Sequence, residues 1–178
     1  KKDCNMFAGY MQNDVTEFLL FVIDCFHSGL KREVDMSISG NVKNGVDSLA
    51  TECYKMMQNM YKTEFSEILN IFYGISVTQI KSQESGEILS RKCEPFSILT
   101  LSLPEKQETN IFECLDMYGT DEELKGENAW QNDKTNKKED VKKNIIFWSL
   151  PNVLIIDLKR FNNANRKIHS MVHTPINN

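Results

Sequence analysis

The sequence predicts an α+β fold, with helices in the first part of the chain and strands in the second. Two segments, residues 14–29 and 47–72, carry apolar side chains at helical spacing. After Gly74 the apolar residues alternate with polar ones or form short runs bounded by Gly, Pro and Ser, which is the pattern of strands. Helices that precede the strands, rather than alternate with them, favour α+β. The length of 178 residues suits one domain or a piece of a larger one.

The first helix is expected to start at Asp14. The carboxylates of Asp14 and Glu17, three residues apart, form a variant of the capping box, in which each side chain can accept from an otherwise unbonded backbone N–H. Apolar side chains then cover every side of the helix, so we expect it to be packed within a larger body. Gly29 is placed to end it.

The next segments predict a connection and more helix. Residues 31–45 hold two glycines and mixed charges and are expected to form an exposed connection. Residues 47–72 predict a second helix or a broken pair of helices. The methionines in this segment are expected to fill the core, since Met packs into irregular gaps more often than it binds a ligand.

The strands are expected to begin after Gly74. Residues 77–89 predict a two-stranded ribbon that turns at Ser85 and Gly86, and residues 96–103 alternate as a half-buried strand does.

The remaining elements follow from local patterns. Residues 110–118 predict a short helix, and residues 120–124, TDEEL, predict the start of another. Residues 131–143 are almost wholly polar, with charges that alternate in sign, and predict a solvated loop or hairpin tip. Two strands, 144–150 and 152–161, close the ordered part. The second strand is apolar on both faces, so we expect it inside a sheet with cover on each side.

Composition excludes several classes of protein. The net charge of −4 supplies no basic field for a nucleic-acid backbone, so nucleic acid is not expected as a partner. The longest uninterrupted apolar run, residues 18–23, is far shorter than the about 20 residues that span a bilayer. We therefore expect no membrane association. Five cysteines without a C-x-x-C pair argue against a secreted disulfide framework and favour an intracellular protein, cytoplasmic or nuclear.

Five segments occur in the order in which they occur in one enzyme family: GYMQNDVTEFLLFVIDCFH, FYGISVTQI, CEPFSILTLSLP, CLDMYGTDEELKGENAW and IIFWSLPNVLIIDLKRF. From about Phe7 to Pro175 the chain resembles the middle of the catalytic domain of ubiquitin-specific proteases. The most specific parts are the Q-x-D-x-x-E-F-L box at residues 12–19, the E-P-F…L-S-L-P strand and the L-K-R-F strand end.

The resemblance implies a papain-like cysteine peptidase fold with the architecture of an open right hand, here incomplete. It has a helical thumb, a mixed palm and antiparallel β fingers that hold ubiquitin. In this chain, residues 7–73 would form the thumb helices and residues 74–161 the fingers and palm strands. Residues 162–178 would begin the palm segment that leads to the histidine.

The family's chemistry needs a thiolate nucleophile, a histidine, and an acid or amide that orients the imidazole. The cysteine lies in a Gly-Asn-x-Cys segment and the histidine in a Gly-His-Tyr segment, and neither is in this sequence. Among the cysteines and histidines present, only Cys4 and either His169 or His173 could come together as a catalytic pair. However, no sequence pattern that forms an oxyanion hole flanks Cys4. We therefore assign no catalytic residue, and we expect the 178-residue chain alone to be inactive.

The resemblance also implies substrate contacts. Asp14 and Glu17 would pair with arginines of the ubiquitin tail. Capping of the helix is the alternative for both, and the roles conflict only in part because a capping carboxylate has a second oxygen. Gln12 belongs to the same box, with a hydrogen bond inside the turn as its alternative. Phe161 resembles a residue that lines the tail channel, with core packing as the alternative.

Many family members hold zinc with two C-x-x-C pairs at the fingertips. Aligned through Gly86 and Trp130, those cysteines fall on poor zinc ligands: Ser82, Ser85, Asn132 and Thr135. We expect neither zinc nor another cofactor, and fingers held by strand pairing alone.

The resemblance favours a deubiquitinase that, as the full-length protein, hydrolyses isopeptide bonds at the C-terminus of ubiquitin, with ubiquitin or ubiquitinated proteins as partners. Two alternatives stay open. One is an inactive homologue that keeps only the grip on ubiquitin, and the other is an unrelated α+β domain with chance similarity.

Overall fold

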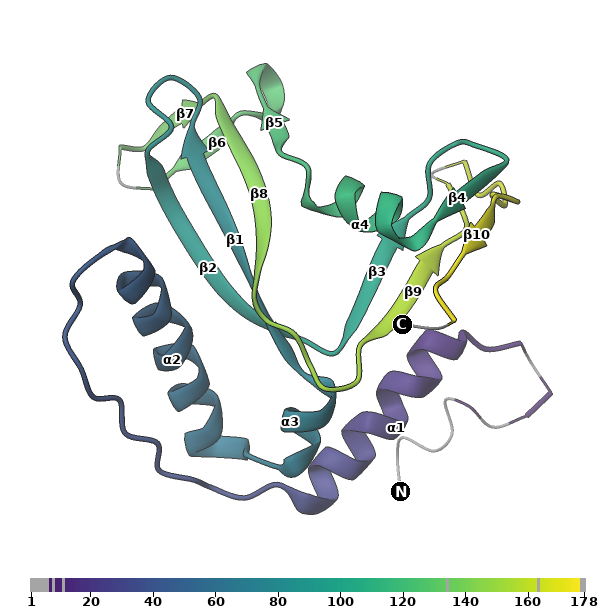
Figure 1. Ribbon diagram of the computed structural model, residues 1–178, viewed down its shortest axis with the longest axis horizontal. Helices are drawn as coiled ribbons and strands as arrows, with labels where there is room; N and C mark the ends of the chain where they lie inside the picture. The colour runs from purple at the N-terminus through teal and green to yellow at the C-terminus, as the bar shows by residue number, and fades with distance from the viewer. Residues whose placement is uncertain (1–6, 8, 11, 134, 163, 177–178) are drawn as a thin grey trace. The chain divides into compact units, whose positions relative to one another are not determined.

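The computed structural model describes residues 7, 9, 10, 12–133, 135–162 and 164–176, and the chain divides into two compact units (Figure 1). The first unit comprises the chain up to Tyr73 together with Pro151–Val153. The second comprises Gly74–Leu150 and Leu154–Asn178. No helix in the described residues is both long enough and apolar enough to span a membrane.

The first unit contains three helices, α1 (Val15–Leu30), α2 (Gly45–Glu64) and α3 (Glu67–Phe72). Of the two alternatives predicted for residues 47–72, the broken pair of helices is the one observed. The break occurs at Phe65, whose backbone is extended and forms an antiparallel bridge with Arg32. Because the chain leaves the helical conformation there, α3 starts as a separate helix.

The connection before α2 lies along that helix. The Val34 N–H donates to the Tyr61 carbonyl at 3.0 Å, and the Gln58 side-chain amide donates to the Met36 carbonyl at 2.6 Å. Most side chains of the connection are exposed, as predicted, but these bonds fix part of its backbone to α2.

Helix α1 differs from the prediction in two ways. Ile23 is its buried residue, while Phe18 and Phe26 are 48% and 59% exposed, so the described chain does not cover the helix on every side. A helix that is apolar on all sides can be buried completely, but the area that is buried depends on which elements pack against it. The helix also continues past Gly29 and ends at Leu30.

The last predicted strand is shorter than expected because its first residues belong to the helical unit. The Val153 N–H donates to the Ile71 carbonyl at 2.8 Å, and the Asn152 side chain donates to the Asn70 carbonyl at 2.9 Å. Strand β9 accordingly spans Ile155–Lys159.

An antiparallel sheet in the order β2-β1-β8-β5 organises the second unit. Strands β1 (Gly74–Ser82) and β2 (Ile88–Phe96) form the predicted ribbon, and Gly86 in its turn has φ +70°, a conformation that glycine adopts without strain. Strand β8 (Val141–Ser149) pairs with β1 on its other side.

The expected helix start in TDEEL was wrong, because this segment forms strand β5 (Glu122–Leu124). In the sheet, Glu122 lies opposite Lys143 and Glu123 opposite Lys142 of β8. The Lys143 ammonium lies 3.1 Å from the Glu122 carboxylate. Cross-strand pairing with residues about 20 positions away therefore overrides the local helix signal.

Two pairs of parallel strands complete the apolar part of this unit. Strand β3 (Ile98–Ser102) pairs with β9, and β4 (Glu108–Asn110) pairs with β10 (Met171–His173). Within the described chain β9 has this one partner strand and its apolar residues are half-buried, so the expected central strand with full cover was wrong. The core beside these strands consists of Leu99, Leu101, Leu103, Ile111 and Cys114.

The predicted short helix is confirmed as α4 (Ile111–Gly119), with Asn110 as its N-cap. The polar segment near residues 131–143 contains a small hairpin of β6 (Trp130–Asn132) and β7 (Lys137–Glu139), which follows a single 3₁₀ turn, η2 (Gly126–Asn128). The predicted hairpin tip is therefore present.

Candidate functional site

Asp14 caps α1, as the sequence predicts. Its backbone is extended, and its Oδ1 accepts hydrogen bonds from the N–H groups of Thr16 at 2.7 Å and Glu17 at 3.2 Å. These N–H groups belong to the first turn, where no carbonyl of the helix is available to them. The Asp14 side chain thus starts the helix by local bonding.

Both capping bonds use one oxygen of Asp14. Within the described part of the chain, Oδ2 accepts no hydrogen bond and the Glu17 carboxylate has neither a hydrogen bond nor an ion pair. The capping box is therefore half formed. Asp14 and Glu17 are both exposed, as is Gln12, so three oxygen-bearing side chains of the box face solvent at the start of α1.

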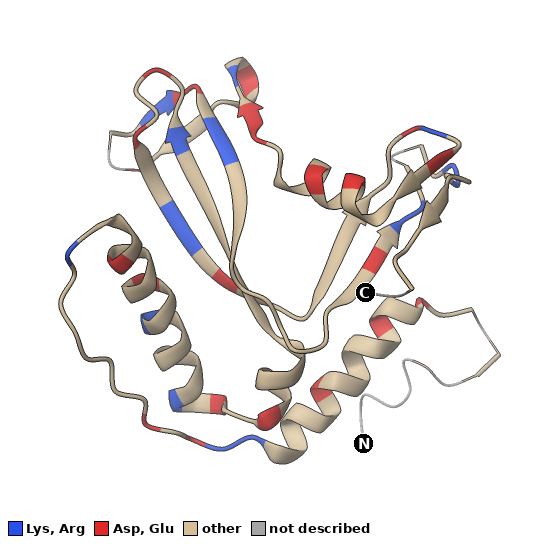
Figure 2. Ribbon diagram, in the orientation of Figure 1, with Lys and Arg blue, Asp and Glu red and all other residues tan. Residues whose placement is uncertain are grey.

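Helix α1 carries no basic charge that would neutralise these carboxylates. Its sequence contains Glu17 and Asp24 but no Lys or Arg, and Figure 2 shows acidic segments along this helix. The partial positive charge of the helix N-terminus favours anionic side chains there, and both side chains are exposed to a cationic partner. A guanidinium could meet such carboxylates through charge-assisted hydrogen bonds.

Phe7 packs against the first turns of α1 from the segment that precedes it. Its ring centroid lies 5.3 Å from that of Phe18 and 5.3 Å from that of Phe21. These ring contacts hold Phe7 against the face of α1 that carries Phe18 and Phe21.

Phe161 lies in the second unit, directly after β9. Its backbone forms an isolated bridge with Lys167, and its side chain is 53% exposed. An exposed ring is not a core aromatic, so the packing alternative does not describe this residue. Gln12, Asp14 and Glu17 belong to the first unit.

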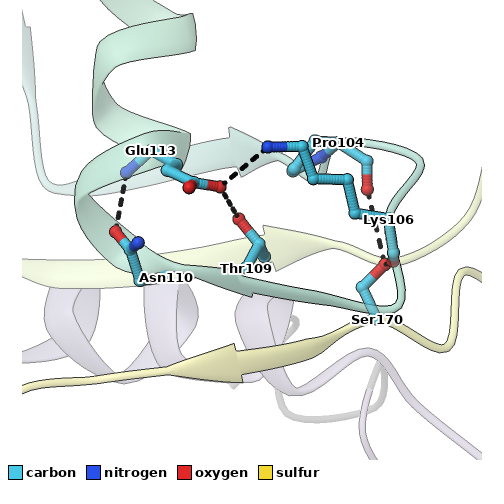
Figure 3. Close-up of polar contacts among 6 residues, drawn as sticks. All are labelled: Pro104, Lys106, Thr109, Asn110, Glu113 and Ser170. Atoms are coloured by element: carbon cyan, nitrogen blue, oxygen red, sulfur yellow. Dashed lines mark hydrogen bonds and ion pairs between the residues drawn. The ribbon is translucent and has the colours of Figure 1, made fainter.

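Arg160, the neighbour of Phe161, has a structural role. Its guanidinium donates to the Ser170 carbonyl at 2.9 Å and to the Ile168 carbonyl at 3.5 Å. The Ser170 hydroxyl in turn bonds to the Lys106 carbonyl, shown in Figure 3. Ser170 is 5% exposed, so this buried residue links the end of β9 to the loop before β4.

A second polar group joins that loop to α4. The Glu113 carboxylate accepts from the Thr109 hydroxyl at 2.8 Å and lies 3.3 Å from the Lys106 ammonium (Figure 3). The Thr109 hydrogen bond, and then the Lys106 charge, hold the pKa of Glu113 below its usual value. Glu113 therefore stays ionised and fixed beside β4.

Sequence reasoning missed a polar contact in the first unit. The His27 Nδ1 lies 2.7 Å from the Ser66 hydroxyl, and its Nε2 lies 3.9 Å from the Glu64 carboxylate. The order serine, histidine and carboxylate is that of a hydrolase triad, but the Ser66 side chain is fully buried and cannot meet a substrate. No local pattern predicts a contact between residues 39 positions apart.

The proposed catalytic alternative gains no support. Cys4 lies outside the described residues. His169 has no hydrogen bond or ion pair to a described residue, and His173 lies 3.5 Å from the Glu108 carboxylate rather than beside a thiol. In the described segments, no group of three or more His, Cys, Asp and Glu side chains is arranged to hold a metal ion.

Comparison with known proteins identifies the domain. The sequence profile of the ubiquitin carboxyl-terminal hydrolase family matches residues 1–177. The chain belongs to the ubiquitin carboxyl-terminal hydrolase family. Relatives of the chain occur in a yeast and in a virus. Ubiquitin carboxyl-terminal hydrolase 5 of Saccharomyces cerevisiae is 29% identical over 98% of the chain, and probable ubiquitin carboxyl-terminal hydrolase R319 of Acanthamoeba polyphaga mimivirus is 28% identical over 84%.

The chain spans only part of the length of those relatives, 23% of the yeast protein and 32% of the mimivirus protein. Its structure resembles a chain in the SAGA Ubp8/Sgf11/Sus1/Sgf73 DUB module bound to ubiquitin aldehyde, with a TM-score of 0.66 and 22% identity. The match covers 98% of this chain and 33% of that one. The predicted ubiquitin-specific protease fold is therefore confirmed.

Proposed function

We propose that the chain is part of a cysteine-type deubiquitinase, which hydrolyses isopeptide bonds at the C-terminus of ubiquitin. The observation that carries this proposal is the family match over residues 1–177. In the proposed reaction a thiolate attacks the carbonyl carbon, a histidine transfers the proton to the leaving amine, and water then hydrolyses the acyl-enzyme.

Ubiquitin or ubiquitinated proteins would be the partners of this site. The Oδ2 of Asp14 and the carboxylate of Glu17 are exposed and could receive arginines of the ubiquitin tail, while Asp14 keeps its capping bonds through Oδ1. Gln12 would add a hydrogen bond beside them, and the exposed ring of Phe161 would line the path of the tail. The neighbouring protein in the SAGA DUB module is described with ubiquitin aldehyde bound, which supports this choice of partner.

The 178-residue chain would bind without catalysing. The support is chemical: a nucleophile needs a positioned base and hydrogen-bond donors for the oxyanion, and the histidines at 169 and 173 contact no described thiol.

We also propose an intracellular location, cytoplasmic or nuclear. The four described cysteines are thiols rather than disulfides, which suits a reducing compartment. The net charge of −4 gives no reason to expect nucleic acid as a partner.

The test uses the full-length protein and ubiquitin that carries a fluorescent leaving group at its C-terminus. We expect release of the fluorophore, loss of release after alkylation of thiols, and no release from a ubiquitin-free control peptide. Binding of ubiquitin without any release would identify an inactive binding homologue instead. Absence of both binding and release would contradict the proposal.

A further inference from the structure

Two turns lie at one end of the second unit, and a cleft there separates the first of them from the strand that follows the second. One turn joins β1 to β2, and the other joins β6 to β7 (Figure 1). The cleft has a volume of about 710 Å³ and is lined by Ser82, Gln83, Glu84, Lys138, Glu139 and Asp140. The turns contain the four positions that correspond to zinc-binding cysteines in many proteins of the family.

The first turn is closed by the side chains of Ser82 and Ser85. The Gly86 N–H donates to the Ser82 carbonyl at 3.0 Å, and the Ser85 N–H donates to the Ser82 hydroxyl at 3.3 Å. The Glu87 N–H donates to the Ser85 hydroxyl at 3.2 Å. The fifth residue, Gly86, has φ +70°.

The described residues of the second turn repeat these hydrogen bonds with different side chains. The Asn136 N–H donates to the Asn132 carbonyl at 2.7 Å, and the Thr135 N–H lies 3.4 Å from the Asn132 side-chain oxygen, Oδ1. The fifth residue, Asn136, has φ +53°. In both turns, therefore, the first residue accepts from the fifth through its carbonyl and from the fourth through its side chain, and the fifth is left-handed.

One carboxylate organises the second turn. The Oε1 of Glu139 accepts from the side-chain amide of Asn132 at 2.8 Å and from the Thr135 hydroxyl at 2.9 Å. Asn132 is 7% exposed, so its amide needs a partner inside the protein. The next residue, Asp140, accepts from the Gly126 N–H at 3.2 Å and ties the hairpin to η2.

The side chains at the four equivalent positions do not fit zinc. Two serine hydroxyls, one amide and one threonine hydroxyl are neutral, weak ligands, whereas structural zinc takes thiolate, imidazole or carboxylate. Their oxygens are also already engaged as hydrogen-bond acceptors for the turns or as donors to Glu139. The expectation that strand pairing alone holds the fingers was therefore incomplete.

We propose that these two turns are the metal-free counterpart of a zinc-binding pair, and that Glu139 fixes the second turn by joining its first and fourth residues. In a Cys4 site the metal joins those residues through their thiolates. Here the Glu139 carboxylate joins them through two charge-assisted hydrogen bonds. In the first turn the fourth residue, Ser85, instead accepts from the backbone N–H of Glu87.

Three variants test the role of Glu139. Glu139→Ala removes both acceptors, Glu139→Gln keeps a side-chain carbonyl that can accept both bonds, and Glu84→Ala is a matched control, since Glu84 lines the same cleft without a hydrogen bond in the described chain. Amide hydrogen exchange followed by NMR reports on Asn136 in the second turn and on Gly86 in the first.

We expect Glu139→Ala to accelerate exchange at Asn136 by about tenfold or more, from the loss of two bonds to a charged group. Gly86 should exchange at its original rate, Glu139→Gln should restore most of the protection, and Glu84→Ala should change neither amide. Equal exchange in Glu139→Ala and the unmodified protein would overturn the role of Glu139. So would an equal effect of Glu84→Ala.

Metal content tests the other half of the proposal. After exposure to zinc and dialysis, the protein should hold no stoichiometric zinc, and a chelator should leave its melting temperature unchanged, unlike domains whose folding depends on metal. One tightly held equivalent of zinc, lost together with the folded state when a chelator is added, would overturn the metal-free assignment.

Discussion

The imidazole of His27 and the hydroxyl of Ser66 are hydrogen-bonded at 2.7 Å, although they lie on different helical segments 39 residues apart. Ser66 occupies the N-cap position of α3, yet its side chain makes no capping bond to that helix. The hydroxyl faces His27 instead and joins α1 to the start of α3.

Ser66→Ala is expected to lower the free energy of unfolding by about 1–3 kcal/mol, because it leaves a largely buried imidazole nitrogen, on a side chain that is 12% exposed, without its partner. Chemical denaturation measures this loss. Ser37→Ala serves as a control, since Ser37 is exposed and has no hydrogen bond to a described residue. In a double-mutant cycle with His27→Ala, the combined loss should be smaller than the sum of the single losses. Additive losses would show that the two side chains are not coupled.

Arg32 and Glu67 form a bidentate ion pair, with N···O distances of 3.0 Å and 2.6 Å. The Arg32 guanidinium also lies 5.0 Å from the centre of the Phe65 ring. The hydrogen bonds from Arg32 lower the pKa of Glu67 from its ordinary 4.5 to about 2.

A depressed carboxyl pKa gives stability that is present above the ordinary value and lost as the pH falls. For Glu67 the loss should occur between pH 4.5 and about 2. NMR titration of its carboxyl carbon should give a midpoint near 2, and Arg32→Gln should move the midpoint toward 4.5. A midpoint of 4.5 in both proteins would show that the pair does not persist in solution.

Charge reversal at Glu17 tests the proposed ubiquitin contact in the full-length protein. If Glu17 holds an arginine of the tail, Glu17→Arg should weaken ubiquitin binding by roughly 2–5 kcal/mol for a contact buried on binding, and by much less for one at the rim. Its melting temperature should change little, since Asp14 provides the observed cap.

Glu17→Gln and ubiquitin without its tail arginines are the controls for that measurement. The contact predicts that Glu17→Arg impairs binding of intact ubiquitin far more than binding of the arginine-less form. Equal loss for both ligands, with a drop in stability of about 0.5–2 kcal/mol in both variants, would assign Glu17 to the helix start alone.

The 178-residue chain should not turn over a ubiquitin reporter, and a ubiquitin probe that traps thiolates should not label it. The reason is that none of the described histidines, which would have to act as the base, contacts a thiol, and the measurement is intact mass after incubation with the probe. Mass added at Cys4 would identify a nucleophile within this chain and contradict the expectation of inactivity.

Features whose hydrogen-bond donors and acceptors lie within about five residues of each other could be predicted from local sequence patterns. The start of α1 at Asp14, the start of α4 at Asn110 and the turn at Gly86 all depend on such local bonds, and all three were predicted in place or nearly so. The capping role of Asp14 is observed because its hydrogen-bond partners lie two and three residues away in the same chain. Contact of ubiquitin with Gln12, Asp14, Glu17 and Phe161 needs a second molecule and stays a prediction.

Features that need a partner far away in the sequence depend on contacts that exist only in the folded chain. TDEEL became a strand because Lys142 and Lys143 of β8 lie opposite its glutamates, and the all-round apolar helix α1 kept exposed phenylalanines because the described chain covers it incompletely. Similarly, Glu139 became the centre of a turn through side chains that lie near it only after β6 and β7 have paired. A sequence pattern indicates which side chains of a segment can be buried or can form hydrogen bonds. The free energy of those contacts is gained only when folding brings the partner residues together.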